Sequence, residues 1–269
     1  RPLPIDITQP LVIDASSSPG LTLTRLLTSG DSFSLSADTT FKNVASFTHG
    51  GIAISSGVNL RLDQTTQAGE VQSSISGSGS LKKEGAGTLT LSGKNSWAGG
   101  TTVSEGDLVI ATGDSLPTSS TAGIADTTVE KDAQLTFLND SAASYTYAGS
   151  IDGDGKVLKD GTGTVELAGP TAGILSDWKG GTEILNGTLK VTALTSLPQN
   201  TPADPTIGDV DISGSSGILE LHLKTNGTYA GVASGNGQLK KSNPRDSPQR
   251  LNVSPTHERW PQGGFSRCP

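Results

Sequence analysis

Residues 77–93 read GSGSLKKEGAGTLTLSG, and residues 153–169 read GDGKVLKDGTGTVELAG. When Gly77 is aligned with Gly153, every glycine of the first stretch falls on a glycine of the second. Each contains a short triplet in which apolar and polar residues alternate, Leu89-Thr90-Leu91 in the first copy. Self-similarity of this kind is typical of chains built from stacked structural repeats. We therefore interpret the chain as a repeat protein.

The similarity continues beyond these stretches, after a five-residue insertion in the second copy. Trp97 then aligns with Trp178, and each is followed after one residue by a Gly-Gly pair. A third copy starts near Tyr229 and stops after Lys241, which aligns with Lys159. Two copies are thus nearly complete, and the third is truncated.

The pattern inside each copy predicts short β-strands. Apolar residues at every second position turn one face of a strand inward and the other toward water. The flanking glycines permit the positive φ angles of tight corners, and no capped helical stripe lies between the triplets. A β-sandwich or an antiparallel barrel also has short strands at such spacing, but repetition favours a solenoid, in which each unit buries its apolar face against a neighbour. The predicted fold class is all-β, a right-handed parallel β-helix (β-solenoid) with an irregular C-terminal tail.

Composition and charge agree with this interpretation. Hydrophobic residues make up 32% and aromatic residues 4% of the 269 residues, with 35 Gly and no Met. Low hydrophobicity is also a signature of disorder, but the regular alternation of Leu, Val and Ile weighs against it. The net charge of −7 disfavours nucleic acid and anionic membranes as partners. One cysteine, Cys268, excludes a disulfide framework. Because Arg1 is not an initiator, we expect a processed product or a fragment.

The repeated stretch resembles the passenger-associated transport repeat, also called the autotransporter-associated β-strand repeat. The pattern of that family runs roughly G-x-L-x-K-x-G-x-G-T-L-x-L-x-G-x-N-x-Y/W-x-G-G-T-x-V-x-x-G-x-L. The first copy fits it at Leu81, Lys83, Gly85, Gly87, Thr88, Leu89, Leu91, Gly93, Asn95, Trp97, Gly99, Gly100, Thr101, Val103, Gly106 and Leu108. The second copy fits it at Lys159, Gly161, Gly163, Thr164, Val165, Leu167, Gly169, Trp178, Gly180, Gly181, Thr182, Ile184, Gly187 and Leu189.

The resemblance implies a function for the chain. It implies a fragment of a bacterial autotransporter passenger: a structural, adhesin-like β-helix displayed at the cell surface after export through the periplasm, with repeats that support export and folding. The implied partners are an unidentified host or matrix receptor, glycan or protein, and a translocator β-barrel that such proteins carry and that this sequence lacks. We expect a monomer with no cofactor and no enzymatic activity. The alternative is a hydrolase on the same scaffold, either an esterase or a polysaccharide-active enzyme.

Three regions are predicted along the chain. Residues 1–56 have no copy elsewhere and are expected to form irregular N-terminal β rungs. Residues 57–241 are expected to form the β-helix, with repeat units near 75–110 and 151–192 and a truncated third from about 231. Residues 242–269 hold four of the seven Arg and five of the fourteen Pro. We predict a disordered, non-repeat tail there, arising from a reading-frame shift or a cloning boundary; the alternative is a natural Pro-rich linker.

Two serine motifs suggest hydrolases only weakly. Gly113-Asp114-Ser115-Leu116 spells the signature of a family of serine esterases in which Ser115 would be the nucleophile. The aligned segment of the next copy, residues 194–197, lacks the Gly and the Asp, and no later Asp-x-x-His pair follows. Gly30-Asp31-Ser32 is followed by Phe33 where trypsin-like passenger proteases have Gly, and His49 comes after the serine. Both motifs are therefore interpreted as turns.

The remaining candidate groups also have a structural interpretation. Asp152, Asp154, Asp160 and Glu166 are acidic, but lysines stand between them and the calcium-binding nonapeptide pattern is not matched. The three histidines, His49, His222 and His257, lack zinc-ligand spacing. Trp97 and Trp178 could stack on a sugar if exposed, but a core or corner role is favoured. We predict no catalytic, cofactor-binding or metal site.

Overall fold

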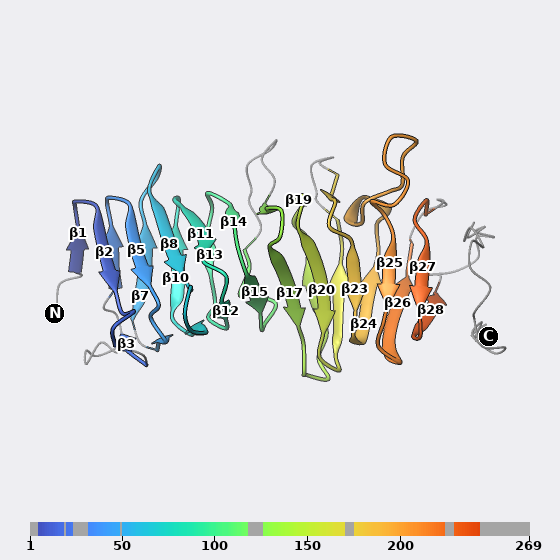
Figure 1. Cartoon of the computed structure of the whole chain (residues 1–269), viewed down its shortest axis with the longest axis horizontal. Helices are drawn as coiled ribbons and strands as arrows, with labels where there is room; N and C mark the ends of the chain where they lie inside the picture. The colour runs from blue at the N-terminus through green and yellow to red at the C-terminus, as the bar shows by residue number, and fades with distance from the viewer. Residues whose placement is uncertain are drawn as a thin grey trace. The chain divides into compact units, whose positions relative to one another are not determined.

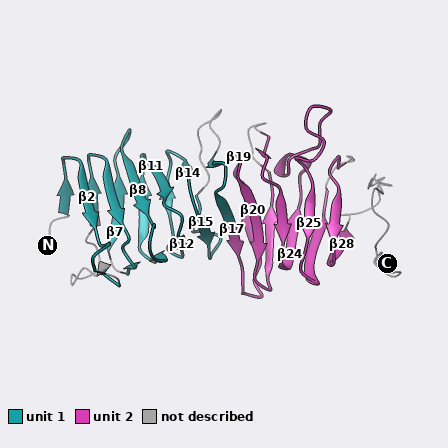
Figure 2. Ribbon diagram, viewed as in Figure 1, with its two compact units in different colours: residues 1–135 teal, residues 136–269 magenta. Residues whose placement is uncertain are grey.

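The computed structural model describes residues 5–18, 20–23, 32–48, 50–117, 126–169, 175–223 and 229–242. Within these ranges the chain consists of β-strands joined by turns, with one short 3₁₀ helix, η1 (Leu194–Ser196). It divides into two compact units, residues 1–135 and 136–269, which Figure 2 shows in separate colours. Within each unit the strands succeed one another as the coils of a winding chain (Figure 1).

The strands of unit 1 form three parallel sheets, and the first fifteen strands go to the three sheets in rotation. The first sheet holds β1 (Ile5–Ile7), β4 (Ser32–Leu35), β7 (Gly51–Ile54), β10 (Ser74–Gly77) and β13 (Ser96–Trp97). The second holds β2 (Leu11–Asp14), β5 (Thr39–Lys42), β8 (Asn59–Asp63), β11 (Ser80–Glu84), β14 (Thr101–Val103) and β16 (Thr127–Val129). The third holds β3 (Thr22–Leu23), β6 (Ser46–Phe47), β9 (Gly69–Val71), β12 (Thr88–Leu91) and β15 (Asp107–Ile110). Each coil up to β15 therefore contributes one strand to each sheet, as in a parallel β-helix.

The strand register gives the length of a coil in unit 1. Leu60 of β8 pairs with Leu81 of β11, and Leu81 pairs with Thr101 of β14. Each such pair marks one complete turn of the chain. Leu81 and Thr101 both belong to the first sequence copy, so one copy is longer than one coil. The repeat seen in the sequence is therefore a different unit from the single coil seen in the structure.

Unit 2 is built in the same way. One sheet holds β18 (Tyr145–Tyr147), β21 (Thr164–Leu167), β24 (Asn186–Val191), β26 (Ser216–Leu221) and β28 (Gln238–Lys241). A second holds β20 (Lys156–Asp160), β23 (Thr182–Ile184), β25 (Val210–Ile212) and β27 (Ala233–Gly235), while β19 (Ile151–Gly153) pairs with β22 (Asp177–Trp178). The division between the units falls within β17 (Gln134–Leu138). Coils are less uniform in unit 2: Thr164 pairs with Thr188, whereas Asn186 pairs with Ser216.

The structure confirms the predicted all-β, parallel β-helical fold. The strand pairs within the two units are parallel, so the sandwich and antiparallel-barrel alternatives are wrong. The expected alternation is also present: in β12, Leu89 and Leu91 are buried while Thr88 and Thr90 are half-buried. Of the predicted tail at 242–269, Ser242 is described, and its amide N–H donates to the Leu221 carbonyl at 3.2 Å, whereas residues 243–269 lie outside the described residues. The predicted boundaries at 56 and 241 stay predictions.

Candidate functional site

The most unusual feature of the interior is a lysine in a column of apolar side chains. Cross-strand neighbours on the inner face of the second sheet of unit 1 are Phe41, Leu62, Lys83, Val103 and Val129. Each is 0% exposed, Lys83 included. The alternation of β11 accounts for this position, because Lys83 lies two residues after the buried Leu81 and therefore points inward too.

The buried ammonium of Lys83 is held by three backbone carbonyls. Its Nζ donates to the carbonyl oxygen of Glu84 at 3.0 Å, of Gly85 at 2.6 Å and of Glu105 at 2.8 Å. The first two belong to the corner that follows β11, and the third belongs to the next coil. An ammonium has three N–H donors and no acceptor, so all its donors are satisfied without water. We call this arrangement, Lys83 with Glu84, Gly85 and Glu105, the lysine corner.

The second copy contains the same arrangement within unit 2. Lys159 is 0% exposed, and its Nζ donates to the carbonyl oxygens of Asp160 at 2.5 Å, Gly161 at 2.7 Å and Asn186 at 3.0 Å. Two acceptors again come from the lysine's own corner, and one comes from the following coil. The repeated sequence therefore encodes a repeated polar site inside an otherwise apolar core.

Burial lowers the pKa of these two lysines, and nearby carboxylates raise it. Burial lowers the pKa of Lys83 to about 8, and the carboxylates of Asp107, Asp63 and Glu105 oppose the shift. Burial likewise lowers the pKa of Lys159 to about 8, against the carboxylates of Asp160 and Asp140. Both pKa values lie above neutral pH, so both side chains stay protonated at pH 7 and supply the three donors that the carbonyls require.

A glycine of the following coil packs directly against each lysine corner. Gly106 has a φ of 65°, and a Cβ atom at this position would lie 2.4 Å from the carbonyl oxygen of Gly87 and 2.6 Å from that of Gly85. Gly187 has the same φ, and a Cβ there would lie 2.4 Å from the carbonyl oxygen of Gly161. Any side chain would be both strained and obstructed, which explains why this repeat position is glycine in both copies.

The repeat tryptophans are core residues. Trp97 is 2% exposed and Trp178 is 0% exposed. The indole Nε1 of Trp97 donates to Thr101 Oγ1 at 3.2 Å and to the Gly100 carbonyl at 3.1 Å, and Trp178 Nε1 donates to Thr182 Oγ1 at 3.1 Å. The favoured core and corner role is therefore confirmed, and sugar stacking on these rings is excluded because their faces are covered.

Asn95 connects three successive coils. Its Oδ1 accepts the amide N–H of Ile75 at 2.7 Å, and its Nδ2 donates to the carbonyl of Ser115 at 2.8 Å. In the second copy the aligned residue is Ser176, whose Oγ accepts the amide N–H of Ile151 at 3.3 Å. The asparagine thus bridges to both neighbouring coils, whereas the serine hydroxyl bonds to the preceding one.

The serine of the esterase-like motif lies in a buried turn. Ser115 is 0% exposed, its Oγ lies 2.7 Å from Thr112 Oγ1, and its amide N–H donates to the Thr112 carbonyl at 3.0 Å. A nucleophile requires access to substrate and a base within hydrogen-bond reach, and the contact here is to another hydroxyl. The turn interpretation fits this geometry. Gly30 and Asp31, the side chain of Ser32, His49 and His257 lie outside the described residues.

The acidic stretch of the second copy is dispersed over separate contacts. Asp154 lies 3.5 Å from Lys179, and Glu166 lies 3.1 Å from Lys190. Asp160 Oδ1 accepts the amide N–H of Gly161 at 2.7 Å and the side-chain amide of Asn186 at 2.8 Å. The described part of the chain contains no group of three or more His, Cys, Asp or Glu side chains that could hold a metal ion. Of the histidines, His222 is described, and its Nδ1 lies 2.8 Å from Ser242 Oγ.

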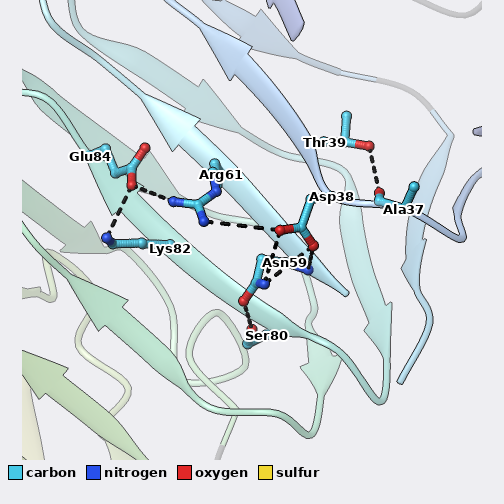
Figure 3. Close-up of polar contacts among 8 residues, drawn as sticks. All are labelled: Ala37, Asp38, Thr39, Asn59, Arg61, Ser80, Lys82 and Glu84. Carbon is cyan, nitrogen blue, oxygen red and sulfur yellow. Dashed lines mark hydrogen bonds and ion pairs between the residues drawn. The ribbon is translucent and has the colours of Figure 1, made fainter. Parts of the chain in front are cut away.

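The outer face of the second sheet in unit 1 carries charges of both signs (Figure 3). Arg61 lies between two acids, with Nη1 2.8 Å from Glu84 Oε1 and Nη2 4.0 Å from Asp38 Oδ2. Lys82 also reaches Glu84, at 3.1 Å, and Asn59 donates to Asp38 (Figure 3). Such exposed pairs contribute little to stability, and because they alternate in sign they create no strongly charged patch.

Sequence reasoning missed the lysine corner, although a signal for it is present. The repeat pattern includes Lys83, but its burial is not among the predictions. The two-residue alternation places Lys83 in phase with Leu81, and Lys159 in phase with Val157. A lysine at an inward position, followed after one residue by Gly-x-Gly in both copies, indicates an ammonium held by a tight corner.

Comparisons with known proteins agree with the fold and the repeat. The family described as Passenger-associated-transport-repeat matches residues 81–110 and 157–191, which run from β11 to β15 and from β20 to β24. Each match includes one lysine corner together with its acceptor from the following coil. No solved structure matches the chain. No helix in the described ranges is long and apolar enough to cross a membrane.

A curated relative is the Adhesin BmaC autotransporter of Brucella suis biovar 1 (strain 1330), which is 33% identical over 203 residues. The alignment covers 65% of this chain, and the chain spans only 6% of the length of that relative. The resemblance inferred from the sequence is thereby supported: the chain is a parallel β-helix that carries two matches to the passenger-associated-transport repeat and is similar to an autotransporter adhesin.

Proposed function

We propose that the chain is a non-catalytic, surface-displayed segment of a larger adhesin-like passenger, and that its repeats stabilise stacked coils during export. The observation that carries this proposal is the lysine corner, which occurs in both matched repeats and joins each repeat to its following coil. The ammonium groups at these corners are not accessible to a ligand in solution, since Lys83 and Lys159 are buried. A repeat built this way acts on folding rather than on a substrate.

The rest of the proposal follows from the adhesin relative. Its name describes an adhesin and an autotransporter, which supports display at the outside of the cell and contact with a receptor. We propose a glycan or protein of the host or its matrix as that receptor, a translocator β-barrel as the export partner, and a monomeric chain. Catalysis is not part of the proposal, because Ser115 is buried and contacts another hydroxyl.

Export is tested by placing residues 1–269 between a signal peptide and a translocator barrel in a Gram-negative host. The fraction of passenger that added protease removes from intact cells measures display. We expect the double variant Lys83→Met, Lys159→Met to lower this fraction, and the matched double variant Lys82→Met, Lys156→Met to leave it unchanged, because Lys82 and Lys156 lie on the same two strands but face solvent. Equal display of both double variants would refute the role of the repeats in export.

Adhesion is tested with the same cells. We expect cells that display the chain to bind host-cell monolayers or matrix glycans more than cells that display the barrel alone, with the purified chain competing for the binding. Binding that does not exceed the barrel-only control would remove the adhesive part of the proposal. Hydrolysis of p-nitrophenyl esters that is lost in Ser115→Ala would contradict the non-catalytic assignment.

A further inference from the structure

We propose that each repeat lysine is a latch closed by the coil that follows it, so that a repeat is complete only when its C-terminal neighbour has docked. This inference rests on the proposed function and deepens it, because it says which docking event buries the lysine of each repeat. It rests on the positions of three carbonyls, on a comparison of the three copies and on the packing of one glycine.

The acceptors of the ammonium are distributed unequally between coils. Two of the three carbonyls around Lys83 lie one and two residues further along the chain, and the third, Glu105, lies 22 residues further on. For Lys159 the third acceptor, Asn186, lies 27 residues further on. The preceding coil contributes an apolar neighbour, Leu62, at the cross-strand position of Lys83. The ammonium is therefore completed from its C-terminal side.

The third copy contains a lysine at the same position of its strand, and the residues after Ser242 lie outside the described ranges. Lys241 aligns with Lys159, and it follows the buried Leu239 at the same two-residue spacing. β28 pairs with β26 on one side, and no strand in the described ranges pairs with its other side. Lys241 is exposed, whereas Lys83 and Lys159 are fully buried. The three lysines share the same spacing within their strands, and the two buried ones are those whose following coil is described.

The glycine of the following coil couples its docking to the closing of the latch. Gly106 sits where any Cβ would meet the carbonyl oxygens of Gly87 and Gly85, so the following coil lies directly on the corner that holds Lys83. Closing this contact expels water from the ammonium and supplies the Glu105 carbonyl in one step. An ammonium that loses water without gaining an acceptor is unfavourable, so the two events are expected to occur together.

The test is pulsed amine acylation during refolding of the purified wild-type chain, with N-hydroxysuccinimidyl acetate as the reagent and peptide mass spectrometry as the readout. Lys82 is the internal control, because its half-exposed side chain stays reactive in the folded state. Parallel deuterium pulses report protection of the amides of Ser104, which donates to Lys83, and of Gly87, which donates to Gln64.

We expect Lys83 to become at least about tenfold less reactive than Lys82 in the folded chain. We expect this protection to arise together with that of the Ser104 amide, and not before it. Protection of Lys83 that precedes the Ser104 amide would overturn the proposal, because the latch would then close without the following coil. The measurement needs no substitution, no export and no receptor, so its outcome is separate from that of the proposed function.

A pair of glycine variants tests the same point at equilibrium. Gly106→Ala places a methyl group against the carbonyl oxygens of Gly87 and Gly85, and so obstructs the packing of the following coil. Gly57→Ala introduces a methyl group at a similar positive φ with nothing within 4 Å. We expect Lys83 to regain at least about half of the reactivity of Lys82 in Gly106→Ala and to stay protected in Gly57→Ala. Continued protection of Lys159 shows that unit 2 is still folded. Full protection of Lys83 in Gly106→Ala would overturn the proposal, and if that variant unfolds, the wild-type refolding experiment decides.

Discussion

The ammonium nitrogen of Lys83 lies 2.8 Å from the carbonyl oxygen of Glu105, 22 residues further along the chain and on the next coil. This contact makes one charged side chain part of the interface between coils. The same relationship joins Lys159 to Asn186 in the second copy. The lysines are therefore the residues at which substitutions should have the largest and most diagnostic effects.

Lys83→Met should destabilise the chain strongly. Methionine fills much of the same space, but it leaves the carbonyls of Glu84, Gly85 and Glu105 without their donor inside the core. We expect a loss of about 2 to 4 kcal/mol in the free energy of unfolding, measured by urea denaturation. Lys82→Met, which removes an exposed ion pair on the same strand, should change it by less than about 0.5 kcal/mol. Equal midpoints for the two variants would show that the carbonyls do not need the ammonium.

Stability should rise with pH above about 8. The pKa of Lys83 and of Lys159 is about 8 in the folded chain against an ordinary value of 10.5, so the folded chain releases these protons first. Between those pH values the unfolded chain binds more protons, and the free energy of unfolding increases with pH, by at most about 1.4 kcal/mol per pH unit for each lysine. Below pH 8 this contribution is flat.

The pH dependence is measured as the difference in unfolding free energy between the wild type and the double variant Lys83→Met, Lys159→Met. The acids that face these lysines are Asp63, Glu105 and Asp107 in unit 1 and Asp140 and Asp160 in unit 2. Both proteins contain the same acids, so the difference reports the two lysines. We expect the difference to grow from pH 8 to pH 10.5. A difference that is constant over this range would show that burial does not lower the two pKa values.

Asn95→Ala should weaken two coil interfaces at once. The substitution leaves the Ile75 amide and the Ser115 carbonyl without their partners in a buried position. We expect a loss of about 2 to 3 kcal/mol, with faster hydrogen exchange at the Ile75 amide. Ser96→Ala, at the neighbouring exposed position, is the control and should stay within about 0.5 kcal/mol of the wild type. Unchanged exchange at Ile75 would contradict the bridging role of Asn95.

Trp97 and Trp178 should be inaccessible to solvent and to sugars. Both indoles are buried and hydrogen-bonded to a threonine hydroxyl four residues later. In a Trp260→Phe background, fluorescence should be resistant to iodide quenching and unaffected by added glycans. Trp97→Phe should keep most of the packing but lose the N–H contact with Thr101, at a cost of about 1 to 2 kcal/mol. Efficient quenching of the two remaining tryptophans would contradict their placement in the core.

The sequence by itself determined the elements and the class of the fold. The alternation of Leu89, Thr90 and Leu91 specifies a strand with one buried face, and the glycines around it mark corners, because both signals depend on residues close together in the chain. The similarity of two copies is likewise present in the sequence, and it is enough to infer stacking and the family resemblance. These properties are local or repeated along the chain, so the sequence is sufficient to predict them.

The tertiary structure decided which residues meet. The sequence copies begin at Gly77 and Gly153, but Leu60 lies over Leu81 in unit 1, and that pairing sets the coil length. Lys83 could be placed on the inner face by counting residues, yet its burial depends on Glu105 and Gly106 of another coil. The hydrogen bond between Lys83 and the Glu105 carbonyl cannot be predicted from the alternation within one strand, because it forms only when the next coil packs onto the corner. The local pattern therefore predicts the strand, and only the stacking of coils shows that its lysine joins them.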